Sequence, residues 1–329
     1  MIMICVAALI TLVVCLLLGV PYIEFMKKKT YSQYLREEVA QMHAQKANTP
    51  TTGGVFLVLA ILLGSLTALF MAEETTTRAL IVLMTLVFYA FTGFEDDIKK
   101  IKGQKNEGLS ARGKLMLQIA VSMLPAFYLI FSGQTEVSFI GFSIELGWFY
   151  PIFTVFMIVG SSNALNLTDG LDGLAASCSF FAFLACAFIC FVNTYLDLAI
   201  ISAAAAAACA GFFFFNKKPA RIFMGDTGSL ALGGLLATVA IMGKFELWLI
   251  PIAIIFICET LSVMLQVASF KLTGKRIFKM SPLHHHFELS GWSEKKIVAT
   301  FALVTAIAAF LSCSAYVAYK IMSAGNVIA

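Results

Sequence analysis

Ten long apolar runs constrain this chain more strongly than any other feature of its sequence. A helix needs about 20 apolar residues to cross the hydrocarbon core of a bilayer, and each run approaches that length. Only 13% of the 329 residues are charged and 60% are apolar, a balance that excludes an ordinary soluble domain. We therefore expect an all-α polytopic membrane protein, a single integral-membrane domain over residues 1–329, with about ten transmembrane helices at residues 2–23, 53–72, 78–94, 114–132, 148–165, 174–192, 196–215, 228–243, 248–270 and 297–319.

The basic residues alternate between the connecting segments. All Lys and Arg residues except Arg78, Lys244 and Lys320 fall in segments that lie on one side of the predicted membrane. Cytoplasmic loops carry the excess of Lys and Arg in membrane proteins, so this side is predicted to be cytoplasmic and both termini extracytoplasmic. The outer loop at residues 133–147 alternates polar and apolar side chains, which favours a small periplasmic hairpin.

The richest polar segment is residues 161–173, between the fifth and sixth runs. Such a cluster is costly in hydrocarbon and belongs at the interface or in a wet cavity. Carboxylates beside glycine amides suit a metal ion and a phosphate. The alternative is a polar loop in which Thr168 or Asp169 caps the next helix. The candidate substrate-binding side chains of this segment are Asn163, Asn166, Asp169 and Asp172.

A second polar segment leads into the eighth run. Asp226 lies between glycines at the predicted start of a helix, where anions are favoured. A carboxylate there makes most sense if it binds a divalent cation that in turn binds phosphate; the alternative is a simple N-cap. Phe223 either stacks on a base or anchors the chain at the interface. Asn216 and Gly225 complete the candidates of this segment.

Further charged candidates lie on the same predicted side of the membrane. Asp96 and Asp97 close the third run, where one acid suits a metal and the other a proton; the alternative is interfacial charge balance. Lys114 opens the fourth run and either meets a phosphate or extends to the interface. Lys46 and Thr51 flank a turn before the second run and either contact an anion or anchor the helix start.

Three consecutive histidines, His284, His285 and His286, follow the ninth run. Neighbouring histidines rarely all bind one metal, and we find no suitably spaced cysteine, so zinc is disfavoured. Phosphate donors and structural hydrogen bonds are the favoured roles. Glu259, inside the ninth run, is interpreted first as a hydrogen-bond partner for another helix.

Four motifs, taken together and in order, resemble those of the bacterial phospho-N-acetylmuramoyl-pentapeptide-transferases, a branch of the polyprenyl-phosphate N-acetylhexosamine-1-phosphate transferases. The resemblance covers nearly the whole chain. It departs at Thr52, where the family commonly has Met. The motifs are Glu-Asp-Asp at 95–97, Asn-Leu-Thr-Asp-Gly-Leu-Asp-Gly at 166–173, Met-Gly-Asp-Thr-Gly-Ser at 224–229 and Pro-Leu-His-His-His-Phe-Glu at 282–288.

The resemblance implies a reaction and roles for these residues. UDP-MurNAc-pentapeptide and undecaprenyl phosphate would give lipid I and UMP, with Mg²⁺ as cofactor, in the plasma membrane of a bacterium. Asp226 would bind Mg²⁺, with Asp96 and Asp97 as further metal candidates and Asp97 as the base. The nucleotide pocket would comprise Lys46, Asn166, Asp172, Asn216 and Phe223, and the phosphate and sugar region Lys114 and His284–His286.

Several questions stay open at this stage. The lipid phosphate either attacks directly, which we favour, or follows an aspartyl intermediate. The resemblance suggests a homodimer; no nucleic-acid partner is expected. A sister transferase that uses UDP-GlcNAc is the nearer alternative, against which the histidine run argues. A secondary transporter is the other, although the acids gather at one face and we see no inverted repeat.

Overall fold

The computed structural model describes residues 1–28, 49–103 and 108–328, with side chains described as far as Ser323. In this part of the chain, ten helices are long and apolar enough to cross a membrane. The predicted polytopic all-α fold is therefore confirmed. The spanning helices are α1 (Ile2–Lys28), α3 (Gly54–Met71), α4 (Thr77–Gly103), α5 (Ala111–Phe131), α6 (Tyr150–Thr168), α7 (Leu174–Val192), α8 (Leu196–Asn216), α9 (Gly225–Met242), α11 (Ile254–Thr273) and α13 (Glu294–Ile328).

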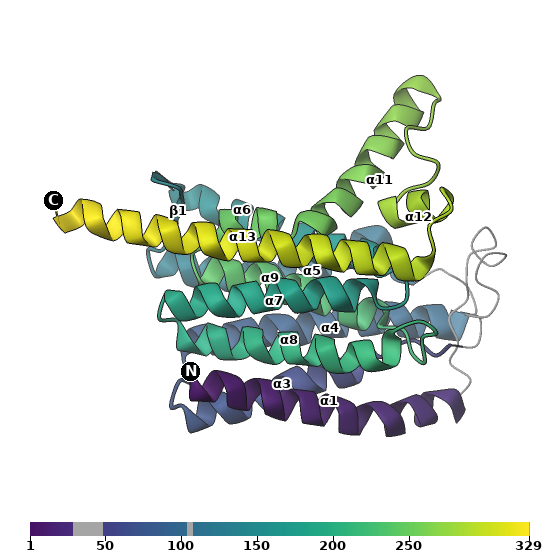
Figure 1. The fold of residues 1–329 in the computed structure, drawn as a ribbon, viewed down its shortest axis with the longest axis horizontal. Coiled ribbons are helices and arrows are strands. Elements are labelled where there is room, and N and C mark those ends of the chain that lie inside the picture. The colour runs from purple at the N-terminus through teal and green to yellow at the C-terminus, as the bar shows by residue number, and fades with distance from the viewer. Residues whose placement is uncertain (29–48, 104–107, 329) are drawn as a thin grey trace.

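The two chain termini lie at the same end of the bundle, as the even number of spans requires (Figure 1). We call this the terminal end and the opposite one the site end. The predicted hairpin is also present, as strands β1 (Glu136–Phe139) and β2 (Phe142–Glu145), which pair antiparallel at the terminal end. Short helical turns η2 (Gly147–Phe149), η3 (Glu246–Trp248) and α10 (Leu249–Ile252) complete that end.

Helix α9 lies at the centre of the bundle, with almost all of its side chains buried. Glycines let its neighbours approach this closely. A Cβ added to Gly93 of α4 would lie 2.1 Å from the Asp226 carbonyl oxygen, and one added to Gly54 of α3 would lie 2.1 Å from the Gly228 nitrogen. Neither space admits a methyl group, so these two glycines fix how α4 and α3 pack on the start of α9.

Several boundaries differ from those predicted, and each difference affects the site. Helix α4 runs on to Gly103 and carries Asp96 and Asp97 within its last turns, and α9 begins at Gly225. The ninth run is broken after the 248–252 region, so α11 begins at Ile254. It leans away from the bundle toward the short helix α12 (Leu283–Glu288) at the site end (Figure 1). Helices α4 and α9 extend beyond the apolar runs because the polar side chains near their ends have hydrogen-bond partners in other helices.

Candidate active site

Asp226 is the charged centre of the site end. It lies in the first turn of α9, and its carboxylate receives hydrogen bonds from three side chains of three other helices. The Lys114 Nζ of α5 is 2.6 Å and the Lys100 Nζ of α4 is 3.1 Å from Oδ2, and the Asn166 Nδ2 of α6 is 2.9 Å from Oδ1. Four helices thus converge on one carboxylate that is 14% exposed.

Asp97 caps the N-terminus of α9 from the neighbouring helix. Its Oδ1 accepts the Asp226 N–H at 3.0 Å, and its Oδ2 accepts the Thr227 N–H at 3.0 Å and the Thr227 hydroxyl at 2.6 Å. These N–H groups have no partner within their own helix. The alternative that Asp226 is itself the N-cap is therefore wrong, because Met224 has that position and Asp97 supplies the capping carboxylate.

Gly225 allows the cap to form. Its backbone has a φ of +70°, and a Cβ there would lie 2.6 Å from the Asp97 Oδ2. Thr51, also predicted from the sequence, is buried beside this turn. A Cβ at Gly225 would also lie 2.9 Å from the Thr51 Oγ1. The two segments are joined by a backbone bond nearby, in which the Gly54 N–H donates to the Met224 oxygen at 2.8 Å. Thr51 and Gly225 thus lie beside Asp97 and define the space around its carboxylate.

Asp96 completes the acid cluster on the other side of Lys100. The Lys100 Nζ lies 2.5 Å from the Asp96 Oδ2 and 3.1 Å from the Asp226 Oδ2, so one ammonium bridges the two carboxylates. The Asp96 Oδ1 also accepts the Leu109 N–H at 2.8 Å. Lys100 was not among the predicted site residues, although its spacing of four from Asp96 on one helix was a usable signal.

The donor set suits a divalent cation. In the described ranges, no group of three His, Cys, Asp or Glu side chains is arranged as a metal cluster. Mg²⁺ does not need one, because it typically takes one or two carboxylates and completes its shell with water and substrate phosphates. A cation already lies between Asp96 and Asp226, in the form of the Lys100 ammonium. The residues therefore fit the predicted Mg²⁺, with Asp226 and Asp96 as its carboxylates and Asp97 already engaged.

Two of the predicted pocket residues, Asp172 and Asn216, bind the backbone of the 217–223 loop through their side chains. The Asp172 Oδ2 accepts the Ala220 N–H at 3.1 Å, and the Asn216 side chain bonds the Gly173 N–H and the Ile222 oxygen, each at 2.9 Å. Both side chains are buried. Glu294 of α13, which sequence reasoning missed, accepts the Asp172 N–H at 2.8 Å and pairs with Lys218.

The remaining predicted pocket residues differ in their surroundings. Phe223 is half-buried, and its backbone bonds Pro50 and Gly53. Asn163 donates to the Gln118 Oε1 at 2.9 Å and so faces α5, one turn deeper in α6 than Asn166. Asp169 is the C-cap residue of α6. The alternative in which Thr168 or Asp169 caps the next helix is wrong, because Gly173 is the N-cap residue of α7 and no described side chain caps that helix. Lys46 lies outside the described residues.

The histidine run forms half of α12, and its members have separate partners. His284 is buried, and Glu259 of α11 accepts its backbone N–H at 3.2 Å and contacts its Nδ1 at 3.1 Å. The predicted role of Glu259 as a partner for another helix is confirmed. His285 pairs with Glu288 at 2.8 Å, and the His286 Nδ1 accepts the Lys279 N–H at 3.1 Å. A Cβ at Gly170 would lie 2.2 Å from the His284 Nε2, so the run packs against the 166–173 motif.

Comparisons with known proteins agree with this geometry. The model of the family described as Glycosyl transferase family 4 matches residues 79–244, a range that includes Asp96, Asp97 and Asp226. The phospho-N-acetylmuramoyl-pentapeptide-transferase of Halalkalibacterium halodurans is 44% identical over 309 residues, 92% of this chain and 94% of the relative. That of Staphylococcus aureus is 45% identical over 315 residues, 94% of this chain and 98% of the relative.

The chain belongs to the phospho-N-acetylmuramoyl-pentapeptide-transferase family. It is therefore a multi-pass membrane transferase, and the resemblance read from the four motifs is confirmed. Within this family's fold, the structure brings Asp96, Asp97, Lys114, Asn166 and Asp226 into one hydrogen-bonded cluster. It places His284–His286 in α12, where His284 packs against Gly170 of the loop that follows α6.

Proposed function

We propose that this protein transfers the phospho-MurNAc-pentapeptide group of UDP-MurNAc-pentapeptide to undecaprenyl phosphate, giving lipid I and UMP, on the cytoplasmic face of a bacterial plasma membrane. Relatives over most of the chain carry the name of that transferase. The observation that supports the proposal most is the shared position of Lys100 and Lys114 on Asp226, at the N-terminus of α9. Acids and exchangeable cations at a helix N-terminus suit phosphoryl chemistry.

In this proposal the lysines bind the substrate phosphates and the acids bind the metal ion. When substrates bind, the Lys100 and Lys114 ammoniums would move from Asp226 to phosphate oxygens, for which they are flexible point-charge donors. That exchange would leave Asp226 and Asp96 as the carboxylates for Mg²⁺. Bound Mg²⁺ would neutralise charge on the pyrophosphate and so make UMP a better leaving group. The N-terminal dipole of α9 would favour the same anions.

We favour direct attack by the lipid phosphate, which is already a competent nucleophile near neutral pH. In this scheme the Asp97 carboxylate holds the start of α9, and with it Asp226, in place. Its three accepted hydrogen bonds support this positioning role. The assignment of Asp97 as a base stays a prediction. A covalent phospho-sugar enzyme, trapped with donor in the absence of lipid, would overturn direct attack.

The two substrates would reach the acid cluster from different sides. The half-buried ring of Phe223 and the loop organised by Asp172 and Asn216 support a nucleotide pocket at residues 217–223. On the other side, α11 leans from the bundle and has exposed apolar side chains along one face: Leu261, Met264, Leu265 and Leu272. That face suits a prenyl chain whose phosphate lies at the site end.

The test is UMP release by purified protein in detergent. Release that requires UDP-MurNAc-pentapeptide, undecaprenyl phosphate and Mg²⁺ together would support the proposal, and a sample without metal tests the cofactor. Activity with UDP-GlcNAc as donor, and none with UDP-MurNAc-pentapeptide, would reassign the protein to the sister transferases. Uptake of substrate into sealed vesicles without UMP release would favour a transporter. The predicted homodimer is tested separately, by the mass of the particle in native mass spectrometry.

A further inference from the structure

The three basic residues that fall outside the cytoplasmic segments have unequal partners at the terminal end. Arg78 is paired with Asp197, with an N–O distance of 2.7 Å. Lys244 donates to the Glu246 Oε1 at 2.9 Å, the Tyr150 hydroxyl at 2.7 Å and the Gln134 oxygen at 3.2 Å, which uses all three of its protons. Lys320 has no salt bridge to any of the residues that the structure describes, and its Nζ lies 5.8 Å from the centre of the Tyr316 ring.

Lys320 lines a polar pocket of about 270 Å³ at the terminal end. The pocket lies over the outer ends of α7, α9 and α13. Its wall includes a packed aromatic cluster: the Trp248 ring is 5.2 Å from the Tyr316 ring and 6.1 Å from the Tyr319 ring, centre to centre. Tyr and Trp side chains of this kind gather at the headgroup level of a bilayer. Hydroxyls of Ser138 and Ser323 also line the pocket.

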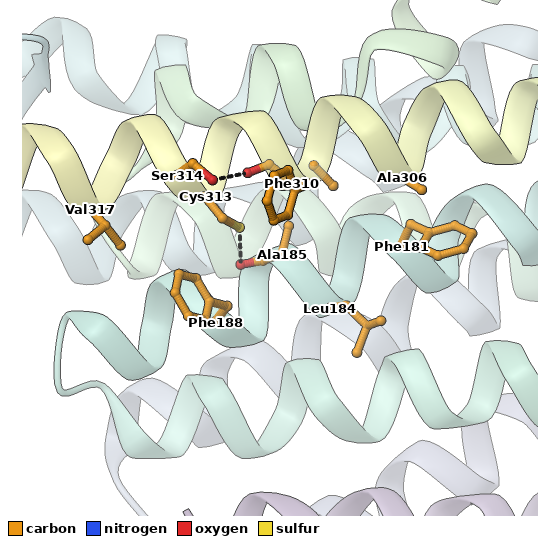
Figure 2. A pocket seen from close by; sticks show the side chains of 10 residues that line it. Phe181, Leu184, Ala185, Phe188, Ala306, Phe310, Cys313, Ser314 and Val317 are labelled. Carbon is orange, nitrogen blue, oxygen red and sulfur yellow. Dashed lines mark hydrogen bonds between the residues drawn. The ribbon is translucent and has the colours of Figure 1, made fainter.

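An apolar groove of about 520 Å³ runs between α7 and α13, deeper in the membrane than the pocket. Figure 2 shows it between α7 and α13, from Phe181 and Ala306 toward Phe188 and Val317. Its one hydroxyl, that of Ser314, already donates to the Phe310 oxygen at 2.9 Å. The groove therefore offers contacts to a hydrocarbon chain and no free polar group.

The groove and the pocket are adjacent along α13. Cys313 of the groove, Tyr316 of the pocket wall and Lys320 are spaced by three and four residues, so they follow one another along a helix face. The Tyr316 hydroxyl also donates to the Asn193 Oδ1 at 2.7 Å, where α7 ends. The groove is apolar, and it leads to a pocket whose Lys320 ammonium has no ion pair among the described residues. That combination matches an amphiphile with an anionic head and a hydrocarbon tail.

We propose that this seam between α7 and α13 binds an anionic phospholipid of the outer leaflet, with its phosphate at Lys320 and an acyl chain in the groove. The positive charge of Lys320 is complementary to a lipid phosphate. The apolar groove, the aromatic wall and the basic pocket follow one another along α13, which is the order that the tail and the headgroup of a lipid require. The site lies at the opposite end of the bundle from Asp226 and is independent of the transferase chemistry.

The test counts bound phosphatidylglycerol by native mass spectrometry of the full-length protein released from detergent. Lys320→Gln is expected to weaken the tightest phosphatidylglycerol about fivefold, the effect of one lysine on an anionic lipid, and Lys320→Arg to retain it. Lys271→Gln, at an exposed lysine of the site end, is the matched control. Ala306→Phe fills the groove and is expected to remove the same lipid, whereas Leu311→Phe, on an exposed part of α13, is expected to leave it bound.

Three results would overturn the proposal. Equal phosphatidylglycerol binding by Lys320→Gln and the unsubstituted protein would exclude Lys320 as the phosphate partner. Displacement of the lipid by inorganic phosphate, with no effect of Ala306→Phe, would indicate a site for a free anion. Equal binding of phosphatidylcholine would show that charge does not select the occupant. Each variant is also assayed for UMP release, which must stay unchanged, so a failure of the transferase proposal is recognised separately.

Discussion

Two aspartates occupy the same local position in this protein and have different surroundings. Asp197 and Asp226 are each the second residue of a spanning helix, α8 and α9, at opposite ends of the bundle. Asp197 is fully buried and receives a bidentate pair from Arg78, at 3.0 and 2.7 Å, together with the Thr76 hydroxyl at 2.6 Å. Asp226 is partly exposed and is bound by two lysines and an amide.

The residue type that pairs with each carboxylate separates a structural role for Asp197 from a proposed chemical role for Asp226. An arginine fork matches a carboxylate in a fixed planar geometry, and its partner is then closed to other ligands. Lysine ammoniums are point charges on flexible stems, so they can transfer to a substrate phosphate. Asp226 also shares Lys100 with a second acid, Asp96, whereas Asp197 shares its arginine with none of the described acids. Four predictions test this contrast.

The largest effect is expected for Asp226→Asn. Removing the charge leaves Lys114 without its carboxylate and Lys100 with Asp96 alone. It also removes the proposed metal ligand, which corresponds to several kcal/mol of transition-state stabilisation, roughly 10³-fold or more in turnover. UMP release per folded protein is the measurement, with a monodisperse gel-filtration profile as the control. A loss of less than tenfold would remove Asp226 from the chemistry.

Asp197→Asn should show the opposite pattern. Breaking a buried pair leaves the Arg78 charge uncompensated, which costs about 3–5 kcal/mol of stability. We expect a clearly lower Tm in detergent and unchanged UMP release per folded molecule below that temperature. If this variant instead lost turnover at an unchanged Tm, the division between structural and chemical carboxylates would be wrong.

Gly93→Ala should disturb the site through packing alone. The added methyl group would meet the Asp226 carbonyl, and such overpacking costs about 1–3 kcal/mol or displaces α4 from α9. We expect reduced turnover, because the carboxylates of α4 and α9 must stay in register. Gly103→Ala is the matched control on the same helix, since a Cβ there meets nothing within 4 Å. Equal turnover in both variants would contradict the close approach of these helices.

Thr227→Val should have the smallest effect. It removes one hydroxyl bond to Asp97 and keeps the two backbone bonds, so the expected loss is about 1 kcal/mol, or roughly fivefold in turnover. Thr227→Ser keeps the hydroxyl and should restore most of the activity. Lost turnover in Thr227→Ser together with unchanged turnover in Thr227→Val would show that the Thr227 methyl group matters, and that the hydroxyl bond to Asp97 does not.

The sequence predicted most of the membrane topology because hydrophobic length and basic loops act locally. Ten spans, both termini at one end and the small hairpin followed from these patterns. It also predicted Asp96, Asp97, Lys114, Asn166 and Asp226 as site residues. Burying a polar group near the end of a span costs free energy unless the group has a partner, so such residues indicate a functional site. Lys100 and Glu294 were missed, since a lysine near a span end and an acid at a helix start have ordinary interfacial explanations.

Residue types were enough to predict the ten spans and to single out Asp96, Asp97 and Asp226 as candidate site residues, whereas the contacts among these residues depend on how the helices pack. Residue types and span lengths are local properties of the chain, so its ten spans and acidic motifs could be read directly. The assignment of Asp97 to the N-terminus of α9, and of Lys100 between Asp96 and Asp226, depends on helices far apart in sequence. Those helices approach each other because Gly93 and Gly54 leave room at the start of α9.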